Sequence, residues 1–155
     1  MRPGLQTHSI TEHILFIAGE QPLAASAASI HCIHEGLRIQ AEPGTKKWFS
    51  GIAVADGRLI PVTDLGSLLS NKPSIGRIIE VSRSIGIAGF RIDSIVGVSR
   101  NEQQVINTET KDNTDFLSGC SGGFAISDNR VDYTVIDFAE LVHSALFTDI
   151  ALTPA

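Results

Sequence analysis

The sequence is poor in cysteine and has no long apolar run, and each shortage excludes a class of protein. Only Cys32 and Cys120 occur among the 155 residues, without a Cys-x-x-Cys motif. We therefore expect reduced thiols in a cytoplasmic protein, with a disulfide between the two as the alternative in an oxidising compartment. No stretch approaches the ~20 apolar residues of a membrane-spanning helix. Residues 1–13 lack a basic start followed by an apolar run, so we expect no signal peptide.

Charge is also scarce, and basic charge most of all. Charged residues make up 19% of the chain, and 12 Lys and Arg stand against 17 Asp and Glu, for a formal net charge of −5. Phosphate backbones and anionic membranes require clustered Lys and Arg, so we expect neither nucleic acid nor a membrane surface as a partner. Hydrophobic residues reach 43%. Such a chain fits one domain with a sizeable core and a sparsely charged surface open to protein contacts.

One stretch, from Ser50 to Leu69, has the pattern of a strand, a tight turn, a second strand and a short helix. Asp56-Gly57 predicts a two-residue hairpin turn, because both residues tolerate the positive φ of a type I′ turn. Pro61 falls in the return strand, where we assign it a structural role. Asp64 is predicted to cap the helix by accepting hydrogen bonds from its free N–H groups. The leucines that follow give this helix one apolar face.

A second copy of this pattern, GGFAISDNRVDYTVIDFAELV, occurs near the C-terminus. Asp128 matches Asp56 at an offset of 72 residues, whereas Asp137 matches Asp64 at 73. We explain the slip by one inserted residue in the second return strand. Asp128-Asn129 then takes the turn position, and Asp137 caps the second helix.

A weaker repeat, with offsets of 64 or 65, relates apolar positions of residues 17–33 to residues 81–98. Internal repetition on this scale predicts two similar β units, each ending in a short helix. We place the halves at about 13–70 and 76–147, with a linker at about 70–75, within one domain over 1–155. Many short strands separated by turns predict a mainly β fold of small barrels.

The segment Leu23–Ile33 is ambiguous at this stage. Its alanines favour a helix, whereas its place in the repeat favours a strand or other extended structure. The repeat decides the prediction in favour of extended structure.

Serine hydrolysis is the enzymatic alternative. Gly119 to Gly123 fits G-x-S-x-G around Ser121, and Asp137 and His143 follow in the order of an α/β-hydrolase. A nucleophile elbow needs a strand before the serine and a helix after it, but here a polar loop precedes and a strand follows. We therefore interpret the motif as a glycine-rich turn and expect no catalytic residue.

Metal binding is the other chemical alternative. His31 and His34 form H-x-x-H, but residues three apart on a strand face opposite sides. No further ligand is apparent nearby in the sequence, so we expect no metal site and no cofactor. Cys32 is interpreted as a small core residue.

Several motifs together resemble the CheW-like family, the coupling proteins of bacterial chemosensory arrays. Gly51 to Leu65, GIAVADGRLIPVTDL, is similar to the family's G-x-x-N-x-R-G-x-x-x-P-V-x-D-L. Arg77 to Val98, Phe116 to Gly119, and Asp137-Phe138 are further matches, and the resemblance covers about residues 13–147. It implies two five-stranded SH3-like β-barrels related by a pseudo-twofold axis over a shared hydrophobic core. It also implies no catalytic activity and two partners, the regulatory domain of a CheA-type histidine kinase and the cytoplasmic tip of a chemoreceptor.

The resemblance further implies a partner-binding surface beside the first hairpin. The corresponding positions are Ile33, Val54, Asp56, Gly57 and Arg58, to which we add Gly119 in the loop before the last hairpin. The family's Asn and Arg are here Val54 and Asp56, and Cys32 stands where members often carry Glu. If that Glu and Arg form a pair in typical members, both partners are missing here. These departures suit a divergent branch, such as PilI-like adaptors of type IV pilus chemosensory systems.

Overall fold

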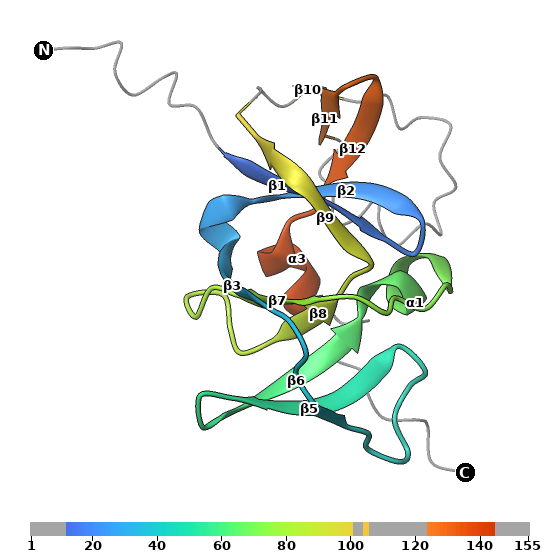
Figure 1. Cartoon of the computed structure of the whole chain (residues 1–155), viewed down its shortest axis with the longest axis vertical. Helices are drawn as coiled ribbons and strands as arrows, with labels where there is room; N and C mark the ends of the chain where they lie inside the picture. Colours follow the sequence, from blue (N-terminus) through green and yellow to red (C-terminus); the bar gives the residue numbers. More distant parts are fainter. Residues whose placement is uncertain (1–11, 101–103, 106–123, 145–155) are drawn as a thin grey trace, which may run out of the picture.

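The computed structural model describes residues 12–100, 104–105 and 124–144, and most of them lie in two β-sheets (Figure 1). The first sheet contains β1 (His13–Ala18), β2 (Gln21–Ser26), β9 (Ser94–Ser99), β10 (Gln104–Val105), β11 (Phe124–Asp128) and β12 (Val131–Val135). The second contains β3 (Ile30–His34), β4 (Ile39–Gln40), β5 (Phe49–Ala55), β6 (Arg58–Asp64), β7 (Ile78–Val81) and β8 (Gly89–Arg91). Short helices are η2 (Ala27–Ser29), α1 (Leu65–Ser70) and α3 (Phe138–Val142).

The predicted fold class is confirmed: the protein is mainly β, with two small SH3-like barrels and few short helices. Each sheet has five strands of three or more residues and one of two residues. We name the first sheet the β11–β12 barrel and the second the β5–β6 barrel. None of the described helices is long and apolar enough to cross a membrane. The ambiguous segment 23–33 is extended apart from the single 3-10 turn of η2.

Each barrel mixes strands from both halves of the sequence. The strand orders are β10-β11-β12-β2-β1-β9 and β4-β5-β6-β8-β7-β3, so replacing every strand by its repeat partner converts one sheet into the other. The first hairpin of each half, β1–β2 or β7–β8, therefore completes the barrel built by the other half (Figure 1). The repeat was predicted, but the expectation that each half forms its own β unit is wrong.

The strand register also corrects the predicted second turn. Asp56 and Gly57 have φ of 51° and 76°, as a type I′ turn requires. In the second hairpin the positive values, 50° and 66°, belong to Asn129 and Arg130, while Asp128 ends β11. The second copy is thus offset from the first by 73 residues throughout, from the turn to the helix. The second return strand contains no inserted residue. The Asp128-Asn129 assignment was wrong by one position, because a chance match of charged residues outweighed the strand register.

A shared apolar core joins the two barrels, as the resemblance implied. Phe138 of α3 is buried between the sheets, and its ring lies 5.0 Å from that of Phe90 and 6.4 Å from that of Phe16, both nearly parallel to it. Phe16 belongs to one barrel and Phe90 to the other, with α3 between them (Figure 1). Burial of such aromatic surface is the main term that holds the barrels together.

Both predicted helix caps are present, in different surroundings. Asp64 accepts a hydrogen bond from Ser67 N at 3.0 Å and a second from Ser74 N at 2.9 Å, and it is 8% exposed. Asp137 accepts from Ala139 N at 2.9 Å but is exposed. Asp64 therefore also fastens the chain that leaves α1, whereas Asp137 only caps α3.

Candidate functional site

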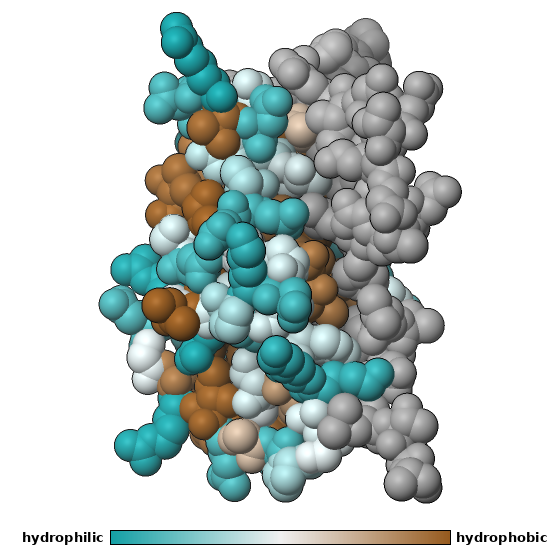
Figure 2. Space-filling view, turned by 90° about the vertical axis from the view of Figure 1, so that its right-hand side faces the viewer, coloured by the Kyte–Doolittle hydropathy of each residue, from teal (hydrophilic) through white to brown (hydrophobic). Residues whose placement is uncertain are grey.

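The tip of the β5–β6 hairpin projects from its barrel and exposes apolar side chains. Val54 and Leu59 face each other across the hairpin and are 57% and 67% exposed. Asp56 stands at the turn with its side chain 86% exposed. Elsewhere, on the face shown in Figure 2, apolar side chains form separate groups among hydrophilic ones. The hairpin tip thus offers a small apolar surface with an acid at its end.

Arg58 leaves this tip and folds back over the barrel, where it meets a buried acid. Its Nη1 donates to Glu80 Oε2 at 2.5 Å, and its Nη2 donates to Glu80 Oε1 at 3.3 Å. The Glu80 side chain on β7 is only 2% exposed. His34 Nε2 donates to Glu80 Oε1 at 2.8 Å. Burial opposes the ionisation of Glu80, but the hydrogen bonds from Arg58 and His34 outweigh it and lower its pKa to about 2.

Cys32 completes a group that we call the Glu80 cluster, namely Cys32, His34, Arg58 and Glu80. The Cys32 Sγ atom lies 3.1 Å from His34 Nε2 and 3.8 Å from Glu80 Oε1. Burial and the neighbouring Glu80 carboxylate raise the pKa of the Cys32 thiol. The thiol is therefore protonated at neutral pH, and Cys32 is a polar participant instead of the plain core residue expected from the sequence.

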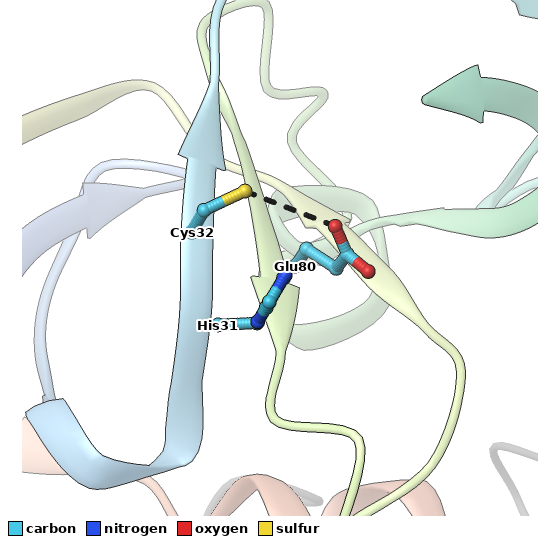
Figure 3. A group of neighbouring side chains, drawn as sticks. All are labelled: His31, Cys32 and Glu80. Atoms are coloured by element: carbon cyan, nitrogen blue, oxygen red, sulfur yellow. Dashed lines mark hydrogen bonds between the residues drawn. The ribbon is translucent and has the colours of Figure 1, made fainter. Parts of the chain in front are cut away.

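A β-bulge brings one more side chain to this cluster. In the β3–β7 pairing, Ile30 opposes Val81 and Cys32 opposes Glu80, so His31 is an extra residue with no partner position. The bulge breaks strict alternation and places His31 and Cys32 on the side of Glu80, where one ligand atom of each lies within 4.8 Å of the others (Figure 3). The prediction that no further ligand lies near the two histidines was wrong, because Glu80 comes from β7, distant in the sequence, and because the bulge brings His31 to its side.

The other barrel acts as an internal control for the cluster. The offsets of 65 and 73 relate the strand pairings of one barrel to those of the other, except at the two-residue edge strands β4 and β10. The counterparts of Glu80, Cys32, His34 and Arg58 are Leu15, Gly97, Ser99 and Val131. Leu15 is buried in a hydrophobic cluster that contains no charged residue. The fold therefore accepts apolar and neutral residues at these positions, so the charged group is not required to build a barrel.

Comparison with protein families matches residues 12–145 to the CheW-like domain. The chain belongs to the CheW-like family. Among solved structures, it is similar to the scaffolding protein TtCheW from Thermoanaerobacter tengcongensis, with 20% identity, 84% of this chain and 92% of that chain covered, and a TM-score of 0.68. The comparison with curated proteins gave no match. The resemblance drawn from the sequence motifs is thus confirmed.

The structure brings together some of the residues that the CheW-like resemblance singled out. Val54, Asp56 and Gly57 share the exposed hairpin tip, whereas Arg58 turns inward to the cluster. Ile33 is partly buried on β3, packed against the shared core. Gly119 and Ser121 lie outside the described residues. Asp137, Asp64 and Pro61 have structural positions, the last in the middle of β6.

Glu80 was not predicted from the sequence, although it supplies the acid of an ion pair that was expected to be absent. Cys32 and Asp56 cannot form the ion pair that the family pattern suggests. Glu80 and Arg58 form an ion pair instead. Glu80 lies on β7, opposite Cys32, and Arg58 lies two residues after Asp56. The available signal was a single acidic residue in the otherwise apolar strand Ile78–Val81. A lone acid at a position expected to be buried needs a partner, and that requirement points to a site.

Proposed function

We propose that this chain is a non-enzymatic cytoplasmic scaffold that couples chemoreceptors to a CheA-type histidine kinase in a bacterial chemosensory array. Its membership of the CheW-like family supports the class of function. The observation that carries the proposal is the β5–β6 hairpin tip, which presents exposed Val54, Leu59 and Asp56 above a base fixed by Arg58 and Glu80.

The chemistry of the tip defines the receptor that suits it. Asp56 occupies the position of the family's Arg, so the local charge is reversed. A receptor tip that binds here should offer a basic or neutral group opposite Asp56, beside an apolar residue that covers Val54 and Leu59. An exposed charge pair contributes at most ~1 kcal/mol, so most of the affinity must come from the apolar contact, and the charge selects the partner.

The test is an Asp56→Arg variant titrated separately against the cognate receptor tip and the kinase regulatory domain. Asn129→Arg is the matched control, because Asn129 holds the equivalent turn position in the other barrel with φ of 50° against 51°. Both substitutions place Arg in the same backbone conformation on an exposed turn, so any effect of backbone strain or of an added Arg side chain is shared. The loss of the Asp56 carboxylate is then the remaining difference.

We expect Asp56→Arg to weaken receptor binding by roughly five-fold or more, the equivalent of ~1 kcal/mol, while kinase binding is unchanged. Asn129→Arg should leave receptor binding as in the natural chain. Unchanged receptor binding by Asp56→Arg would mean that Asp56 is only a solvated turn residue. Loss of kinase binding alone would mean that the receptor and kinase faces are exchanged.

A PilI-like adaptor of a type IV pilus system is the second candidate. It is favoured by Val54 and Asp56, which replace the Asn and Arg of the family pattern. The two candidates share the fold and the kinase, and differ in the receptor. Titration against receptor tips from a flagellar and a pilus pathway separates them, because reversed charge at Asp56 should favour only one class.

A further inference from the structure

We propose that the Glu80 side of the β5–β6 barrel is a binding site for a divalent transition-metal ion of the Zn²⁺ type. Cys32, His34 and Glu80 would be its ligands, and His31 the fourth. The proposal concerns the chemistry of these side chains and is independent of the proposed scaffold function.

Three candidate ligand atoms already converge on one point. His34 Nε2 lies 2.8 Å from Glu80 Oε1 and 3.1 Å from Cys32 Sγ, and Sγ lies 3.8 Å from Oε1. In a tetrahedral Zn²⁺ site with bonds of ~2.0–2.3 Å, ligand atoms are roughly 3.3–3.6 Å apart. Insertion of an ion thus requires shifts of only a few tenths of an ångström up to about half an ångström, within the reach of side-chain rotation.

The fourth ligand comes from the β-bulge. His31 extends from β3 toward Glu80, next to Cys32 (Figure 3). Its ligand atom lies within 4.8 Å of those of Cys32 and Glu80, and its side chain is exposed, so it can turn inward at little cost. The site would therefore have three anchored ligands and one mobile histidine at its solvent edge.

The donor set selects the class of metal. Imidazole and thiolate suit Zn²⁺ and its neighbours in the first transition row, whereas Mg²⁺ and Ca²⁺ take oxygen ligands. Arg58 Nη1 holds Glu80 Oε2 and fixes the carboxylate from behind. The longer contact of Arg58 Nη2 with Oε1, at 3.3 Å, would give way when Oε1 binds the ion. The Cys32 proton passes to solvent when the Sγ–metal bond forms, and both imidazoles bind as the neutral form.

Charge balance supports a divalent ion. The Cys32 thiolate and Glu80 carboxylate together neutralise two positive charges. Arg58 remains next to Asp56, with Nη2 and Oδ2 3.8 Å apart. The group is therefore neutral overall with the ion bound.

The equivalent place in the other barrel has the same backbone but no ligands. Its β1–β9 pairing is also irregular, between Leu15 and Phe16, opposite Gly97 and Ile95. The residue skipped there is Val96, the counterpart of His31. The bulge thus occurs in both copies, whereas the ligand-bearing side chains occur in only one of them.

The test is a titration of the full, untagged chain, freed of metal by a chelator, with Co²⁺ followed by Zn²⁺ competition. Bound Co²⁺ reports tetrahedral geometry through its visible bands and a thiolate ligand through near-ultraviolet charge transfer. We expect one ion per chain with both signatures, and displacement of Co²⁺ by one equivalent of Zn²⁺.

The variants assign the ligands. Cys32→Ser should abolish the charge-transfer band. His34→Ala should weaken metal binding at least ten-fold, and His31→Ala should weaken it several-fold. Cys120→Ser and His143→Ala are matched controls that remove the other cysteine and the exposed histidine that follows α3, and both should bind as the natural chain does. His31→Ala alters an exposed residue, so it keeps the test decisive if a buried variant fails to fold.

Two outcomes overturn the proposal. One is the absence of stoichiometric binding at about 1 micromolar free Zn²⁺, because protein Zn²⁺ sites typically bind with about 10–16 kcal/mol, which corresponds to dissociation constants below that concentration. The other is binding that is equally strong in the Cys32, His34 and His31 variants, since the ion would then sit elsewhere on the chain.

Discussion

The two helix caps offer a quantitative test of the repeat, because equivalent residues are placed in unequal surroundings. Asp64→Ala removes the cap of α1, which costs ~0.5–2 kcal/mol. It also leaves the N–H of Ser74 without its acceptor at a position only 3% exposed, which costs ~1–3 kcal/mol more. Asp137→Ala removes only a cap whose N–H groups can turn to water. We therefore expect losses of about 1.5–5 kcal/mol for Asp64→Ala and about 0.5–2 kcal/mol for Asp137→Ala.

Urea denaturation followed by far-ultraviolet circular dichroism measures both losses. The free energies should be compared at an unchanged m-value, which shows that the variants unfold to the same extent. In a domain of this size 1 kcal/mol corresponds to ~2–4 °C in melting temperature. Asp64→Asn is the matched variant, because an amide oxygen caps nearly as well as a carboxylate, and it should lose less than half of what Asp64→Ala loses.

Equal losses for Asp64→Ala and Asp137→Ala, within ~0.5 kcal/mol, would refute the claim that the Ser74 contact adds to the cap. A loss for Asp64→Asn as large as that for Asp64→Ala would refute the acceptor role itself. The stability of the linker after α1 would then need another explanation.

Three further outcomes follow from the structure. Phe138→Ala should lower the free energy of unfolding by ~3–5 kcal/mol, because the ring is buried against an aromatic side chain of each barrel; urea denaturation checks it. Ser121→Ala should leave kinase and receptor binding unchanged, and a fluorophosphonate probe should label Ser121 no faster than other serines; faster labelling would contradict the non-enzymatic assignment. Replacing Glu80 and Arg58 together by Leu and Val should leave the melting temperature unchanged or raised and should weaken metal binding; a strong loss of stability would show that the pair is structural.

Local signals predicted the hairpin and both caps correctly. Asp56-Gly57 needs only its own backbone freedom to form the turn, and Asp64 and Asp137 need only the free N–H groups of the next three residues. These features depend on short segments, so the amino-acid order nearly determines them. The family motifs fall in the same segments, which is why the fold class was predicted as well.

The exchange of hairpins between barrels was beyond the reach of the sequence. β2 pairs in parallel with β12, about 110 residues later, and β6 with β8 in the equivalent place. Either arrangement, exchanged or not, buries the same apolar faces of β1 and β2, so periodicity does not distinguish them. The one-residue error in the second turn had another cause. The match of Asp128 to Asp56 outweighed a strand register that only backbone pairing reveals.

The Glu80 cluster was missed because Glu80 and Arg58 come from strands far from Cys32 and His34 in the sequence, and the approach of His31 to the cluster depends on a bulge. Two of its positions, Cys32 and His34, share a face by simple alternation, but His31 joins them only because the strand gains a residue at that point. No composition or spacing signal marks such a residue. The acid in Ile78–Val81 was the one visible anomaly.

That anomaly also explains why the cluster points to function. Burying an ion pair removes two charges from water, and an apolar pair of similar volume often stabilises a protein as well or better. This chain contains the comparison within itself, since the other barrel has Leu15 at the position of Glu80 and folds around it. A buried charged group in one copy, with an apolar residue at the equivalent position of the other, is not explained by the needs of the fold, which is why we proposed a binding role for it. Its place under the exposed hairpin tip connects any ligand there directly, through Arg58, to the surface proposed to contact the receptor.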